Sequence, residues 1–146
     1  FVRAADTTYA PPDTPVSFAD GFPVLLVSDA SLNDLNHHLQ SRGKMPVPMS
    51  RFRPNVVISG CEAFTEDTWR TITIGGVTLD VVKPCARCVE TTVDQTTGTI
   101  PDAAEPLATL NSYRKQGSKV LFAQNAVHRA PGALHVGDTV TVMETG

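Results

Sequence analysis

Short apolar runs separated by turn residues recur along the 146-residue chain. Val24–Val27, Val56–Ile58 and Val120–Val127 are almost continuously apolar, which is typical of strands buried on both faces. Val136–Val142 alternates between apolar and polar residues, as a strand with one exposed face does. Eleven prolines and ten glycines supply the intervening turns. The pattern predicts a mainly β fold of about six or seven mostly antiparallel strands in a small barrel-like arrangement.

A hairpin is the clearest local feature. Thr71–Ile74 and Val77–Val81 both alternate with a period of two residues, and Gly75-Gly76 lies between them. A two-residue Gly-Gly turn between alternating runs is typical of a β-hairpin. We therefore expect residues 71–82 to form two antiparallel strands.

Two segments have helical spacing. Ser28 is a suitable N-cap, Leu32, Leu35 and Leu39 fall on one face, and Gly43 ends the first segment. The second begins at Glu105-Pro106, buries Leu107 and Leu110, and ends at Gly117. The N-terminus of the first helix has two possible roles: it covers one end of the sheet, or it faces an anion.

The overall composition narrows the class of protein. The length fits one domain, and the proline-rich beginning predicts a linker or arm over residues 1–15 followed by a domain over residues 16–146. A net charge of −3 gives no electrostatic basis for binding nucleic acid. No apolar run approaches membrane-spanning length. Three cysteines do not make a disulfide framework, which favours a reducing compartment, and we expect a cytoplasmic protein.

Candidate chemistry concentrates in residues 83–93. Cys85 and Cys88 follow Pro84 and lie near the cations of Lys83 and Arg87, a setting that favours the thiolate form. The β-branched run Val89–Val93 predicts a strand directly after Cys88. The pattern places both thiols on a loop between two strands.

A single Cys-x-x-Cys has several interpretations. It can be half of a structural zinc site, but Cys61 is the one other cysteine, and His37, His38, His128 and His135 lack ligand spacing. It can be a thioredoxin-like redox pair, although that motif opens a helix and a strand is expected here. It can also be two ordinary thiols. These alternatives stay open on the pattern alone.

A second polar feature precedes the strand at residue 56. Arg51 and Arg53 flank Phe52, and Pro54-Asn55 follow. Two such arginines are usually a solvated rim. They are also suited to phosphate, because the guanidinium fork matches phosphate oxygens.

Taken together, these segments resemble the MOSC domain, the C-terminal module of molybdenum cofactor sulfurases. The resemblance covers Val16 to the end, and within the family the chain is similar to the mitochondrial amidoxime reducing component and its bacterial relatives, which reduce N-hydroxylated compounds. The motifs that carry it are Phe18-Ala19-Asp20-Gly21, Arg51-Phe52-Arg53-Pro54-Asn55, Lys83-Pro84-Cys85-Ala86-Arg87-Cys88, Glu105-Pro106-Leu107, Phe122-Ala123-Gln124-Asn125 and Val136-Gly137-Asp138. Ala123 stands where relatives often have glycine.

The resemblance implies a barrel-like fold that holds molybdenum through a pyranopterin dithiolene. It implies that Cys88 is the protein ligand to the metal, and a thiolate is a soft ligand suited to such a centre. Arg53, Asn55 and Arg87 are assigned to cofactor binding, and Asp20 lies near the metal as a candidate proton carrier. Cys85 has no implied role beyond structure.

The resemblance also implies partners. Family members have an N-terminal β-domain that completes the cofactor pocket, and from the resemblance we expect that domain to be absent from residues 1–146. Electrons would come from a separate donor protein of the iron–sulfur, flavin or cytochrome type, and the substrate would be a small N-hydroxylated compound. The alternative function is a carrier that holds molybdenum cofactor, or its sulfur as a persulfide on Cys88, without turnover.

Overall fold

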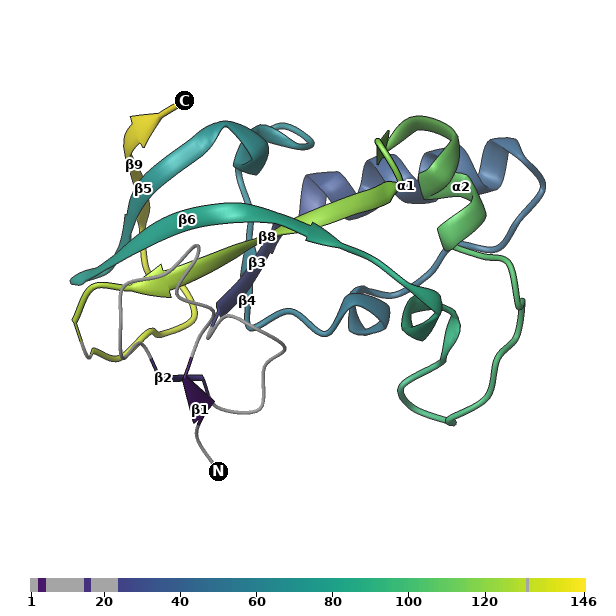
Figure 1. The fold of residues 1–146 in the computed structure, drawn as a ribbon, viewed down its shortest axis with the longest axis horizontal. Helices are drawn as coiled ribbons and strands as arrows, with labels where there is room; N and C mark the ends of the chain where they lie inside the picture. Colours follow the sequence, from purple (N-terminus) through teal and green to yellow (C-terminus); the bar gives the residue numbers. More distant parts are fainter. Residues whose placement is uncertain (1–2, 5–14, 17–23, 131) are drawn as a thin grey trace.

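The fold is a curled, mainly antiparallel β-sheet with two α-helices packed at one end (Figure 1). The computed structural model describes residues 3–4, 15–16, 24–130 and 132–146. The seven-stranded sheet has the order β4-β3-β8-β6-β5-β9, with β7 paired to β8. Its strands are β3 (Val24–Ser28), β4 (Val56–Ile58), β5 (Trp69–Ile74), β6 (Val77–Ala86), β7 (Lys115–Gln116), β8 (Lys119–His128) and β9 (Val140–Thr145). The expectation of a mainly β, barrel-like fold is confirmed.

The sheet contains one parallel pair, β3 with β4, and the other pairings between its strands are antiparallel. The predicted hairpin is confirmed: β5 and β6 pair from Thr71↔Asp80 to Ile74↔Val77, and Gly75 turns the chain with φ +57°. Two short strands, β1 (Arg3–Ala4) and β2 (Pro15–Val16), pair separately. The rest of 1–15 lies outside the described residues, so its assignment as a linker stays a prediction.

Two apolar cores lie on opposite faces of the sheet. Leu26 and Val27 are neighbours in β3, and their side chains point to opposite faces. Leu26 joins the core enclosed by the curled sheet, with Trp69 and Ile72. Val27 joins the second core, which lies under the helices. This double burial explains why β3 is continuously apolar instead of alternating.

The first helix agrees with the sequence pattern. The second is shorter than predicted, because it ends at Tyr113 instead of Gly117 and Lys115–Gln116 pair with β8 as β7. Helix α1 (Asp29–Ser41) buries Leu35 and Leu39, and α2 (Leu107–Tyr113) buries Leu110 against the same core. Ser28 caps α1, because its hydroxyl oxygen accepts a hydrogen bond from the Ser31 N–H at 3.1 Å. Three short 3₁₀ helices complete the described part: η1 (Met49–Phe52), η2 (Thr65–Thr68) and η3 (Val89–Thr92).

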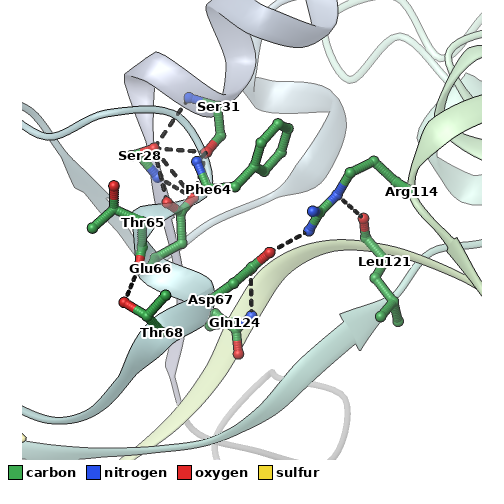
Figure 2. Close-up of polar contacts among 10 residues, drawn as sticks. All are labelled: Ser28, Ser31, Phe64, Thr65, Glu66, Asp67, Thr68, Arg114, Leu121 and Gln124. Carbon is green, nitrogen blue, oxygen red and sulfur yellow. Dashed lines mark hydrogen bonds and ion pairs between the residues drawn. The ribbon is translucent and has the colours of Figure 1, made fainter. Parts of the chain in front are cut away.

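The N-terminus of α1 faces a carboxylate of the chain itself (Figure 2). Glu66 on η2 is 1% exposed and accepts hydrogen bonds from the Ser28 N–H at 3.0 Å and the Ser31 hydroxyl at 2.7 Å. A negative charge at this position complements the helix dipole. The helix N-terminus is therefore occupied by a structural contact, which favours the covering role over anion binding.

Two strand predictions were wrong in part. Val89–Val93 is not a strand: Val89–Thr92 forms η3, in which the Thr91 and Thr92 hydroxyls donate back to the carbonyls of Cys88 and Val89. Such side-chain bonds compete with strand pairing. The final strand begins at Val140 instead of residue 136, because residues 135–138 form a turn closed by the Asp138 carboxylate on the His135 N–H.

A β-bulge interrupts β8 opposite the cysteine segment. Pro84 pairs with Gln124 and Ala86 with Leu121, so β8 has one extra residue over this interval. Ala123 lies in the bulge with φ +78° and is 3% exposed. A positive φ is strained for alanine and free for glycine, which is a physical reason for glycine in relatives.

We expect Ala123→Gly to leave the stability of the fold close to unchanged. The relief of about 1–2 kcal/mol of left-handed strain offsets the lost methyl burial and the added entropy of the unfolded chain. Ala126→Gly is the matched control, because Ala126 is fully buried on the same strand and has no positive φ. The control should cost about 1–2 kcal/mol in chemical denaturation, and equal losses for both variants would contradict the strain argument.

Candidate functional site

The two cysteines of the Cys-x-x-Cys segment have different environments. Cys85 lies within β6, is half-buried and packs against the core under the helices. Cys88 lies two residues beyond the end of β6, is exposed, and precedes η3. The expectation of both thiols on a loop between two strands was therefore wrong for Cys85, which lies in a strand, and wrong for the segment after Cys88, which is η3. Of the two, Cys88 has the accessible thiol.

The Arg87 guanidinium points toward Cys85 and the η1 segment. Its Nη1 donates to the Cys85 Sγ at 3.1 Å, and its Nη2 donates to the Phe52 carbonyl at 3.0 Å. The guanidinium carbon lies 5.4 Å from the centroid of the Phe52 ring, a cation–π distance. Both terminal nitrogens thus have partners within the protein. Arg87, one of the two cations expected beside the thiols, thus contacts Cys85.

Arg51 is neither a solvated rim residue nor an exposed phosphate ligand. It is 7% exposed, and its Nη1 donates to the carbonyls of Thr91 at 3.3 Å and Thr92 at 3.4 Å. Its buried Nε has no hydrogen-bond partner. Arg51 links η1 to η3. The sequence does not reveal this role, because no local pattern marks which of two neighbouring arginines turns inward.

Arg53 follows η1 and is exposed. Its backbone is left-handed, with φ 53° and ψ 49°, a conformation that is uncommon for arginine and often occurs at functional sites. Within the described residues, no hydrogen bond or ion pair engages its side chain. Arg53 is therefore the arginine of this segment that is available to an anion.

Asn55 has a structural contact. Its Oδ1 accepts a hydrogen bond from the Leu25 N–H at 2.7 Å, and its own N–H donates to the Leu25 carbonyl at 2.9 Å. These bonds extend the parallel pairing of β3 and β4 by one residue. Because the oxygen is used, the Asn55 amide nitrogen is the group left to donate to a ligand.

Two of the alternatives for the Cys-x-x-Cys pair, a zinc site and a redox disulfide, find little support in the described structure. All three cysteines are free. Strand geometry separates the Cα atoms of Cys85 and Cys88 by about 10 Å if the extended backbone continues, whereas a disulfide needs less than about 7 Å. Among the described residues, no group of three or more Cys, His, Asp or Glu is arranged to hold a metal ion.

Two further residues of the family motifs are Gln124 and Asp20. Gln124 is buried, and its Nε2 donates to the Asp67 carboxylate at 2.7 Å, while Arg114 pairs with the other oxygen of that carboxylate (Figure 2). Gln124 is thus a structural contact between β8 and η2. Asp20, the predicted proton carrier, lies outside the described residues, so its place near Cys88 stays a prediction.

The comparison with known families agrees with this architecture. The family model of the MOSC domain matches residues 13–141, and the chain belongs to the MOSC domain family.

Within that family, the chain is similar to amidoxime-reducing components. It is 41% identical to the human mitochondrial amidoxime-reducing component 1 over 140 residues, which is 90% of this chain and 40% of that protein. It is 47% identical to the rat mitochondrial amidoxime reducing component 2 over 133 residues, which is 86% of this chain and 38% of that protein. The chain thus spans about two fifths of the length of these relatives.

The described residues also bear on membrane association. None of their helices has both the length and the apolar character that crossing a bilayer requires.

Cys61 and Cys88 should differ in how fast their thiols are alkylated. Burial raises the pKa of the Cys61 thiol above its ordinary value of 9.0, and the nearby Glu66 carboxylate raises it further. Since the thiolate is the nucleophile, we expect iodoacetamide at neutral pH to alkylate Cys88 faster than Cys61. Peptide mapping by mass spectrometry over time measures both rates in one sample.

The control is Glu66→Gln, which removes the negative charge beside Cys61. It should speed alkylation of Cys61 and leave the rate at Cys88 unchanged. Faster alkylation of Cys61 than of Cys88 in the unmodified chain would contradict this account.

Proposed function

We propose that this chain is the molybdenum-cofactor-binding domain of a reductase of N-hydroxylated compounds. One observation carries the proposal: the exposed Cys88 thiol and the exposed Arg53 belong to two segments that Arg51 and Arg87 bond together. These bonds bring the segment of a soft ligand next to the segment of a cation, which supports a shared site for both. The relatives named for amidoxime reduction support the substrate class.

The residues present fit such a cofactor. A pyranopterin dithiolene with its phosphate offers a sulfur-bound metal at one end and an anion at the other. Cys88 would supply a soft sulfur ligand, and no described residue forms a hydrogen bond with its thiol. Arg53 and the Asn55 amide nitrogen supply donors for the anionic end. When bound, the molybdenum centre would supply the two-electron reduction of an N–O bond.

The chain's own residues have separate tasks in this proposal. Cys88 binds the metal, Arg53 and Asn55 orient the cofactor, and Asp20 holds a proton for the product of N–O cleavage. Arg87 was predicted to bind the cofactor. Because both of its terminal nitrogens already bond the protein, it contributes by holding the Cys88 segment in place.

The proposed partners follow from this chemistry. Electrons come from a separate donor protein, and an N-terminal β-domain completes the wall of the cofactor site. We place the protein in the cytoplasm on its cysteine content alone.

The second candidate function, a carrier of the cofactor or its sulfur, also uses Cys88. Turnover of an amidoxime with an artificial electron donor would favour the reductase, and transfer to an apo-acceptor without turnover would favour the carrier.

We expect Cys88→Ser to abolish molybdenum binding and reduction of a benzamidoxime, because an alkoxide is a hard ligand that is poorly populated at neutral pH. Cys85→Ala is the matched variant on the same segment, and it should keep molybdenum and activity while losing some stability. Both are measured by metal analysis and turnover, in a polypeptide that also carries the N-terminal β-domain, made in a cofactor-producing host. An active Cys88→Ser protein would overturn the ligand assignment.

We expect Arg53→Ala to weaken cofactor retention by about 1.5–3 kcal/mol, the worth of a hydrogen bond to a charged group. Pterin fluorescence after gel filtration measures retention. Arg42→Ala, which changes an exposed arginine after α1, is the control and should have no effect. Arg51→Ala should retain more cofactor than Arg53→Ala when the two are compared well below their melting temperatures, and equal retention would count against the assignment.

A further inference from the structure

The segment that carries Cys88 is bonded to η1 at two points. Before Cys88, Arg87 donates from Nη2 to the Phe52 carbonyl at 3.0 Å. After Cys88, the Thr91 and Thr92 carbonyls accept from the Arg51 Nη1 at 3.3 and 3.4 Å. Residues 87–92 are thus held on both sides of the exposed thiol.

The second attachment reaches the backbone of Cys88 through Thr91. The Cys88 carbonyl accepts hydrogen bonds from the Thr91 N–H at 3.1 Å and the Thr91 hydroxyl at 2.9 Å. Arg51 holds the carbonyl of the same threonine from the opposite end of η3. A short chain of bonds therefore runs from the Arg51 guanidinium through Thr91 to Cys88.

Space filling alone does not account for Arg51. Its guanidinium is buried, and its Nε lacks an acceptor. A buried polar group without a partner costs free energy, and an apolar side chain of similar volume would fill the same space without that cost. What an apolar side chain would lack is the donor that bridges two carbonyl oxygens.

We infer that Arg51 is a positioning residue for Cys88. It fixes η3 and so sets the direction of the Cys88 thiol relative to Arg53, which follows directly on η1. What this positioning does for the cofactor rests on the proposed function. The positioning of η3 and Cys88 itself concerns this chain alone and is testable without cofactor.

Hydrogen exchange at the Thr91 amide tests the geometric part. In Arg51→Met, which keeps an unbranched side chain and removes the donors, exchange at this amide should accelerate about tenfold. Arg51→Lys keeps a cation but has no planar fork, so it should give an intermediate rate. Ile72→Val, in the other core, is the control for general destabilisation and should not change Thr91 selectively.

The loaded protein provides a second readout. Molybdenum(V) electron paramagnetic resonance should show one species in the unmodified protein and in Ile72→Val, several in Arg51→Met, and partial recovery in Arg51→Lys. If Thr91 exchange in Arg51→Met and Arg51→Lys rises no more than in Ile72→Val, the positioning role is overturned. If exchange changes as expected but molybdenum binds regardless of Cys88, the geometric role stands and the proposed function fails.

Discussion

The pairing of β6 with β8 is the interaction on which the other parts of the structure depend. These are the two longest strands, and together they contribute to both apolar cores: Leu79 and Ala126 face one, Phe122 the other. β8 also bonds β3 on its other side, which brings in α1. The bulge at Ala123 lies opposite the end of β6, so one of the irregularities of the sheet lies where the segment that carries Cys88 leaves it.

Two buried charged side chains join elements that are distant in sequence. Glu66 binds the start of α1 from η2, and Arg51 binds η3 from η1. Buried charges are poor sources of net stability, because desolvation offsets most of their attraction. Their directional bonds instead determine where short irregular segments lie. The Glu66 carboxylate occupies the N-terminus of α1, and the Arg51 guanidinium holds η3, the segment that follows Cys88, against η1.

This arrangement separates the two thiols of the site. Cys85 is engaged by Arg87 and by the core, whereas Cys88 is exposed just beyond the sheet. Cys85 is therefore placed to support the fold, and Cys88 is the thiol that a ligand could reach. Arg53 lies at the end of a 3₁₀ helix that the Arg87 contact also holds, and its backbone is left-handed.

The sequence by itself determined most of the strands, the hairpin at Gly75-Gly76, the first helix and the middle of the second, because hydrophobic period, turn glycines and caps are local properties of the chain. It also indicated Cys88 and Arg53, through motifs that are contiguous in sequence. Only the tertiary structure decided that residues 89–92 form a 3₁₀ helix, that Arg51 is buried while Arg53 is exposed, and that Cys85 belongs to a strand. The burial of Arg51 and the strand position of Cys85 depend on contacts between residues about 40 positions apart, and no local pattern encodes the partner of a residue across that distance. The 3₁₀ helix is closed by local hydroxyl bonds of Thr91 and Thr92, but the same β-branched residues also favour a strand, so local propensity did not distinguish the two.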